Sequence, residues 1–406
     1  MSWKGISWKR AARYVPVLFG LMAIGWYRGE EYIQRDFNVD AEYYVDLQPI
    51  LPTIEDRQAW WRATNAYFGS AGSYTRSDLF NKQQLKLDVP FSPPFGFRFD
   101  FVADQDFDGI YHHYLLGLDY RFGGAWSVAL VGEPLAQKEY ADIGAALRRR
   151  GDGSFFNLML LLPDFSFDRK NSYKGTLEQK PVNLQLEAVQ KLTDTLDFFT
   201  RVDIDFPLEI RYEYPQFVFD YESRKPSAGL IWRVKPEDLL WCEVGGEYTD
   251  KERRSFSRIS ARDFHTIRRV HEARAEYVRH AKTRHRRALG FNYVHIEEDN
   301  DYPNDPDQIG LLEDLTHRSR MLYGTLRAPV GRQFYFETGL VLDYVSHGET
   351  RPWGRDPVDS SKNGIQGKVP LTVGWQLGPH RVSAGISVQV DAPAFGGGYA
   401  SGLVVF

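Results

Sequence analysis

The residues of this chain that could do chemistry are charged side chains set singly between large apolar ones. Within residues 95–103, for example, Arg98 and Asp100 stand between phenylalanines. Because the side chains of a strand point alternately to opposite faces, the charges fall on one face and the rings on the other. A charged face of this kind can select solutes by electrostatics, or it can hold itself together by ion pairs across the sheet.

If the apolar face touches lipid, the charged face must look into a lumen, because a charge at the bilayer midplane costs about 2–4 kcal/mol on a barrel surface. The predicted lumen-lining residues, as selectivity candidates, are Lys86, Arg98, Asp100, Asp119, Arg121, Arg201, Asp203, Glu209, Arg211, Glu213, Arg233, Glu243, Glu272, Arg274 and Glu276. Asp88 and Glu247 fall on the same face. Both a water-filled pathway and an ion-paired interior of a narrow barrel fit this mixture of signs.

One region, residues 250–287, is strongly basic, with 13 Lys and Arg against five Asp and Glu. Around a turn between two strands it predicts a basic rim formed by Arg279, Lys282, Arg284, Arg286 and Arg287. Such a rim would bind phosphates or attract anionic solutes, and a solvated rim without a partner fits equally well. Nucleic-acid binding is not expected, since the net charge is -4 and the aromatic residues here belong to the strand alternation.

Catalytic motifs are missing from the sequence, which has no GxSxG elbow, no HExxH and no P-loop. His112 and His113 could serve a barrel hydrolase, but no serine stands at a compelling spacing. The acidic stretch 297–315 could hold calcium, although its spacing is not that of an EF-hand and a solvated loop is the simpler interpretation. The single cysteine, Cys242, excludes a disulfide framework and falls on an apolar strand face. We therefore predict no enzyme activity, no cofactor and no metal site.

Period-two alternation defines the elements that carry these residues. It recurs after about residue 60, and examples are 95–103, 182–188, 196–206, 208–214, 334–344 and 382–390. Short turns are expected at 123–124, 225–226 and 378–379, and longer polar loops at 163–181, 297–315 and 346–366. A soluble sandwich or propeller also alternates, but it rarely needs the 15% aromatic residues of this chain.

The N-terminal part differs from the rest. Basic residues precede an apolar stretch at 15–27 that is shorter than a membrane-spanning helix, and Ala23 and Gly25 near its end have the spacing of a signal-peptidase site. We expect a signal peptide at 1–25, a periplasmic tail or plug segment at 26–59 that could also rest as a helix at a barrel mouth, and a β-barrel at 60–406.

The leader, the aromatic-rich strands and the final strand ending in Phe406 together resemble Gram-negative outer-membrane β-barrels. The resemblance implies an all-β fold, a transmembrane antiparallel up-and-down β-barrel of about 16 strands (range 14–18), in the outer membrane of a Gram-negative bacterium. It further implies contact with outer-membrane lipid and lipopolysaccharide, and recognition of Phe406 by the barrel-assembly machinery. A periplasmic partner could bind through 26–59.

Within that class, size and mixed charge are similar to porins and to exporters of acidic polysaccharides. The function expected from this resemblance is a channel that passes or exports hydrophilic solutes or glycans, with anionic ones favoured. The alternative is a structural barrel that anchors a periplasmic or cell-surface complex.

Overall fold

The computed structural model describes residues 54–406, apart from 75–78, 93, 107–108, 134–141, 152, 164–180, 214–215, 256–262, 282–284, 302–313, 352–357 and 391–394. The expected signal peptide and most of the 26–59 segment lie outside this part of the chain. The described residues form one helix, α3 (Ile54–Arg62), and 18 strands.

The strands are β1 (Asn65–Tyr74), β2 (Leu79–Ser92), β3 (Phe95–Asp106), β4 (Gly109–Phe122), β5 (Trp126–Gly132), β6 (Ile143–Gly151), β7 (Ser154–Leu162), β8 (Asn183–Lys191), β9 (Leu196–Glu213), β10 (Gln216–Lys235), β11 (Asp238–Ser255), β12 (Phe264–His280), β13 (Arg286–Asp301), β14 (Asp314–Val330), β15 (Phe334–Arg351), β16 (Val358–Leu377), β17 (His380–Gln389) and β18 (Phe395–Val405).

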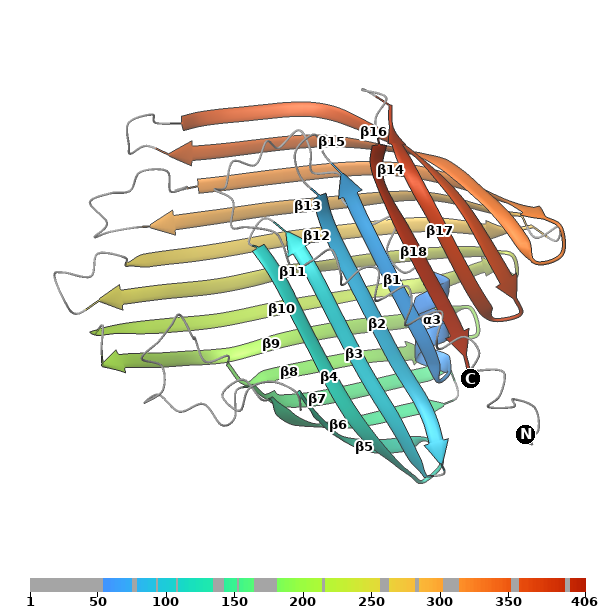
Figure 1. Ribbon diagram of the computed structural model, residues 1–406, viewed down its shortest axis with the longest axis horizontal. Coiled ribbons are helices and arrows are strands. Elements are labelled where there is room, and N and C mark those ends of the chain that lie inside the picture. The colour runs from blue at the N-terminus through green and yellow to red at the C-terminus, as the bar shows by residue number, and fades with distance from the viewer. Residues whose placement is uncertain are drawn as a thin grey trace.

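These strands close into a barrel (Figure 1). Each strand pairs antiparallel with the one before and the one after it, and β1 pairs with β18 from Asn65↔Val405 to Gly72↔Gly398. The backbone N–H of Phe406 also donates to the carbonyl of Thr64 at 2.8 Å, next to this seam. The prediction of an antiparallel up-and-down barrel is confirmed, with 18 strands at the upper end of the expected range.

The outward face of the barrel is apolar because the alternation places every second side chain there. On β15, Leu340, Leu342 and Tyr344 are exposed, whereas Val341 and Asp343 between them are buried. A barrel whose outer surface carries exposed leucines and phenylalanines around its ring has the surface that hydrocarbon requires. Among the described residues, no helix is both long enough and apolar enough to cross a bilayer.

The two ends of the barrel differ in their connections. Even-numbered strands lead into tight turns, such as the one between β4 and β5. There Gly123 and Gly124 have φ of 58° and 75°, a conformation that glycine adopts readily because it lacks a Cβ. Odd-numbered strands lead mostly into longer connections. Because β1 begins and β18 ends beside the tight turns, we name that side the short-turn end and the opposite side the long-loop end.

Three expected boundaries are wrong. Residues 225–226 are not a turn but lie inside β10, where pairing to β11 skips Lys225 and Pro226 and resumes in the same register. Proline lacks an N–H, so it leaves a gap in the ladder without ending the strand. The 346–366 loop is mostly strand, since β15 and β16 extend to Arg351 and from Val358. The segment 196–206 and the described part of 208–214 belong to one strand, β9.

Candidate lumenal site

A helix lies against the inner wall of the barrel. Helix α3 ends at Arg62, just before β1 begins at Asn65, and the Asn65 side chain donates to the carbonyls of Ala59 and Ala63 at the end of the helix. Arg62 stands in the last turn of α3, where a positive charge suits the helix dipole. The chain therefore reverses direction between α3 and β1, and Figure 1 shows α3 behind β1 and β18.

Polar contacts fix α3 to strands that are far apart around the ring. Arg57 forms an ion pair with Glu243 of β11, with 2.9 Å between Nη1 and Oε2. The Trp61 indole N–H donates to Glu187 of β8 at 2.8 Å. On the side of β2, the Lys86 ammonium lies 5.2 Å from the Trp60 ring centroid. The helix thus joins wall positions from β2 to β11, which is about half of the ring.

Apolar contacts also hold α3 against the lumenal face of the wall. Trp61 packs against Phe199 with ring centroids 5.5 Å apart, and Ile54 is completely buried. The buried residues of this cluster are Ile54, Trp61, Phe155, Val189, Phe199, Ile231, Leu239, Trp241, Val278 and Ala288. All the wall residues of the cluster come from the short-turn ends of β7 to β13, so α3 covers an apolar floor inside the barrel at that end.

Arg57 keeps its charge in this setting. Burial and the nearby Arg201 lower the pKa of Arg57 to about 10, and Glu243 opposes the shift. The guanidinium also lies over Trp241, 4.9 Å from the ring centroid. At neutral pH the helix therefore presents a cation inside the lumen, held by a carboxylate and a ring.

The size of the ring shows how much of the lumen α3 takes up. Eighteen strands about 4.8 Å apart and tilted by about 40° make a ring about 36 Å across between opposite backbones. A helix with its side chains is about 10–12 Å across. The body of helix α3 thus takes up about a third of that width, and its side-chain contacts reach the opposite walls at β2 and β11, which makes its level the narrowed part of the described lumen.

An arginine cluster lines the wall formed by β2 to β7. Asp88 accepts from Arg148 at 2.6 Å and from Arg150 at 2.8 Å, and Arg98 donates to Asp119 at 2.8 Å. Asn157 accepts weaker bonds from Arg98 and Arg148. Three guanidiniums thus face two carboxylates, and the cluster retains one positive charge.

A second cluster lines β12 to β15. Glu276 accepts from Arg274 and Arg286, each at 3.3 Å, and from the hydroxyl of Tyr323. The Tyr323 ring lies over Gly290, where a Cβ would meet the ring atoms, so only glycine leaves room for this contact. Glu337 continues the cluster by accepting from Arg327 at 2.6 Å.

Most of the predicted lumen-lining residues lie on the same face as these clusters. Lys86 and Asp100 pair across β2 and β3 at 3.4 Å, Arg201 donates to Glu187 at 3.1 Å, and Arg233 donates to Asp197 at 2.6 Å. The further predicted positions on the lumenal face, by contact or by strand alternation, are Arg98, Asp119, Arg121, Asp203, Glu243, Glu272, Arg274 and Glu276.

Glu209 and Arg211 do not line the lumen, so their prediction is wrong. The β9–β10 register shifts between Tyr221↔Leu208 and Ser223↔Asp205, which leaves one residue more on β9 than on β10. This bulge reverses the alternation of β9. Ile210 becomes buried, and Arg211 and Glu209 pair with each other on the outer face with side chains 73% and 50% exposed. The side chain of Glu213 lies outside the described residues.

The predicted basic rim is divided. Arg286 is buried in the lumen with Glu276, Arg279 lies near Asp238 at 3.6 Å, and Arg287 alternates with Arg286 onto the outer face. Lys282 and Arg284 lie outside the described residues. Because this turn joins β12 to β13, it belongs to the short-turn end of the barrel.

The apolar floor under α3 is the feature that the sequence interpretation missed. Apolar residues were expected to face outward, yet Phe155, Phe199, Ile231, Trp241 and Val278 are buried inside. A signal was present, because each of them stands next to an outward apolar residue, as in 155–156, 198–199, 231–232 and 277–278. Consecutive apolar residues at one end of a strand mark a wall that is covered on both faces.

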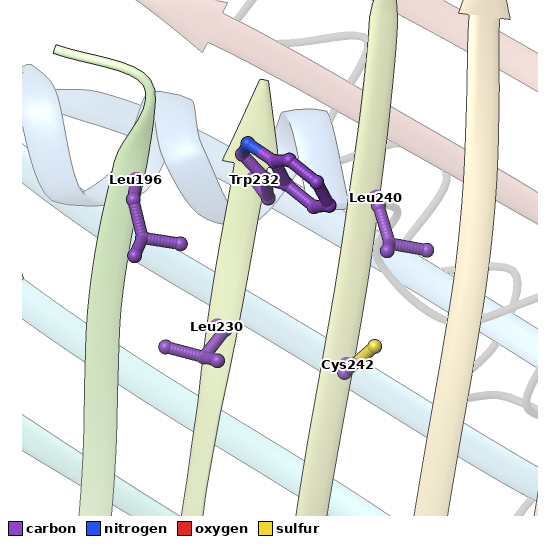
Figure 2. Close-up of a pocket in the computed structure, with 5 residues that line it drawn as sticks. All are labelled: Leu196, Leu230, Trp232, Leu240 and Cys242. Atoms are coloured by element: carbon purple, nitrogen blue, oxygen red, sulfur yellow. The ribbon is translucent and has the colours of Figure 1, made fainter. Parts of the chain in front are cut away.

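The outward neighbours of this floor are seen in Figure 2, where Leu196, Leu230, Trp232, Leu240 and Cys242 project from neighbouring strands. They line an apolar depression of about 250 Å³. Cys242 therefore lies on the outer face, as its alternation predicts.

The described residues offer little to a catalytic interpretation. The Ser319 hydroxyl donates to Asp343 at 2.8 Å, on the lumenal face of β14 and β15. The side chains of His112 and His113 lie outside the described residues. Among the described residues, no group of three or more His, Cys, Asp or Glu side chains could hold a metal ion.

Comparisons with known proteins found no matching family model and no matching curated protein. Among solved structures, the chain is similar to Pseudomonas aeruginosa OccK8 (OprE), with 8% identity, a TM-score of 0.42, and coverage of 85% of this chain and 97% of that one. It is also similar to Pseudomonas aeruginosa OccK3 (OpdO), with 13% identity, a TM-score of 0.40, and coverage of 84% and 94%. A bacterial polysaccharide outer membrane secretin matches with 10% identity, a TM-score of 0.39, and coverage of 85% and 99%.

Proposed function

We propose that this protein is a channel in the outer membrane of a Gram-negative bacterium and that it passes hydrophilic solutes or glycans. The observation that carries the proposal is the opposite character of the two faces of one closed sheet. The outer face is apolar, and the inner face carries ion-paired arginines and carboxylates. Barrels of 16–18 strands leave an aqueous channel, which smaller barrels fill with side chains.

The level of α3 is where such a channel would discriminate between solutes. Arg57, Glu243 and Glu187 meet there beside the apolar floor, so a passing solute would meet charges within a narrowed section. Charges held in a lumen of this kind select ions and polar solutes by electrostatics.

The arginine cluster supports a preference for anionic solutes. The cluster has three guanidiniums, of Arg98, Arg148 and Arg150, for the two carboxylates that they contact. These side chains lie together on one wall. Their excess charge favours anions in the adjoining solution. The preference should be modest, because the wall from β8 to β12 carries carboxylates as well.

Conductance in planar lipid bilayers tests the proposal. Purified full-length protein should give discrete steps, and a salt gradient should give a reversal potential on the anion side. A matched protein sample denatured by heat should give no steps. Silence of the folded barrel at every salt and voltage would refute the channel and favour the alternative of an anchoring barrel, whereas cation preference would refute only the anionic part.

A further inference from the structure

Two arginines stand on the outer face of β14, where its apolar band ends. Along this face, Leu326 and Leu322 are 44% and 56% exposed, while Met321 between the outward positions is fully buried on the lumenal side. The next outward positions toward the long-loop end are Arg320 and Arg318. By strand alternation, the side chains of both arginines therefore lie on the outer, membrane-facing side of the barrel wall.

Aromatic and imidazole rings surround these arginines on the neighbouring strands. The Arg320 guanidinium lies 5.8 Å from the ring centroid of Tyr344, which is its register partner on β15. Arg318 pairs with His295 of β13, with 3.2 Å between Nη2 and Nε2. The His295 ring lies 6.2 Å from that of His271 on β12. We call Arg318, Arg320, His271 and His295 the outer basic patch.

Tyrosines mark the level of this patch. Tyr344 lies under Arg320, and the ring centroid of Tyr293 lies 6.4 Å from that of His295. Tyrosine belts form where hydrocarbon meets the lipid head groups, because the ring is apolar and the hydroxyl is polar. A charge there costs about 0–1 kcal/mol, compared with about 2–4 kcal/mol at the midplane.

The two arginines differ from other charged residues nearby in their partners. Arg269, two positions from His271 on the same face, forms an ion pair with Asp299 at 2.7 Å, and Glu297 lies 3.3 Å from His295. Within the described part of the chain, neither Arg318 nor Arg320 forms an ion pair with a carboxylate. Two guanidiniums at the lipid head-group level thus form no direct ion pair with the described wall, and the carboxylate beside them, Glu297, is engaged by His295.

We propose that the outer basic patch binds the phosphate groups of lipid A, the membrane-embedded part of lipopolysaccharide. Guanidinium and phosphate form bidentate, charge-assisted hydrogen bonds, and a lipid brings its phosphate to this level of the wall. The proposal rests on the outer-membrane location proposed above, in which the longer loops face outward and the short turns face the periplasm. It places the lipid contact at the opposite end of the barrel from the predicted rim at 279–287.

Binding of lipid A in detergent micelles tests the proposal. The probe is labelled bisphosphorylated lipid A, titrated against full-length folded barrel and against the double variant Arg318→Gln/Arg320→Gln. Each arginine should contribute about tenfold or more in affinity, which equals about 1.4 kcal/mol per tenfold. The matched control is Arg279→Gln/Arg287→Gln, which removes two arginines at the short-turn end and should leave the affinity unchanged.

Four results would overturn the proposal. The first three are unchanged affinity in the Arg318 and Arg320 double variant, an equal loss in the control variant, and equally tight binding of lipid A stripped of its phosphates. Displacement of lipid A by inorganic phosphate alone would also overturn it, since that would show a free-anion site.

Failure of this proposal can be told from failure of the channel. Binding in micelles needs no pore, and conductance in bilayers of phospholipid alone needs no lipid A. A double variant with normal conductance and lost lipid A binding would show that the patch acts separately from the lumen.

Discussion

Replacement of Trp61 by alanine should release α3 from the lumenal wall. Trp61 is 3% exposed, packs against Phe199 and donates its indole N–H to Glu187. Truncating a buried aromatic residue to alanine costs about 3–5 kcal/mol. Because α3 lies outside the strand ladder, we expect this loss to shift the equilibrium between docked and released helix, and not to open the barrel.

The expected shift is large enough to be measured. At about 1.4 kcal/mol per tenfold, the docking equilibrium should move by about a hundredfold to a few thousandfold. Single-channel conductance of Trp61→Ala should rise, because the section that α3 narrows becomes wider. Amide hydrogen exchange of residues 54–62 should accelerate, while the amides of β10 to β15 keep their protection.

Trp232→Ala is the matched control. Trp232 projects from the outer face (Figure 2), so its loss removes an indole of equal size without touching α3. Both variants should retain the heat-sensitive electrophoretic mobility of a folded barrel. Faster exchange in α3 with unchanged conductance would refute the idea that α3 narrows the pathway. Unchanged amide hydrogen exchange of residues 54–62 in Trp61→Ala would refute the idea that Trp61 supplies most of the free energy of docking.

Two further predictions concern the two faces of the wall. Asp88→Asn leaves the guanidiniums of Arg148 and Arg150 without their carboxylate. The reversal potential in a salt gradient should therefore move further toward anions, and the free energy of unfolding of the barrel should fall by about 3–5 kcal/mol. A shift of the reversal potential toward cations would contradict the role of the cluster. In bilayers, Cys242 on the outer face should react with a lipid-soluble maleimide and resist a charged thiol reagent. The double variant Cys242→Ser/Ser227→Cys, whose only cysteine is lumenal, should react with the charged reagent. The opposite pattern would show that the outer and lumenal faces are assigned the wrong way round.

Much of the architecture could be read from the order of residues. On β15 and β17, apolar side chains at every second position predicted the outward face, and these positions are exposed in the closed barrel. The reason is local, since the alternation of a strand has a period of two whatever its neighbours are. Ion pairs across the sheet were expected only in general, and the Lys86–Asp100 pair of the structure follows from the same rule applied to adjacent strands.

The same rule failed where one strand contains an extra residue. The sequence alternates within 208–214, but the rule that apolar side chains face lipid predicts the wrong direction for it. The bulge near Phe206 and Pro207 turns Ile210 inward and Arg211 outward. A bulge exists only relative to a partner strand, so no property of β9 alone could reveal it.

The order of residues by itself therefore determined an alternating, membrane-adapted sheet with a charged side and an apolar side. Only the tertiary structure decided how many strands close the ring, and that Arg286 belongs to the lumen with Glu276 and not to a basic rim. It also decided that α3 covers Trp241 and its neighbours inside the barrel. Closure, register and docking depend on contacts between segments far apart in the chain, whereas alternation depends on adjacent residues only.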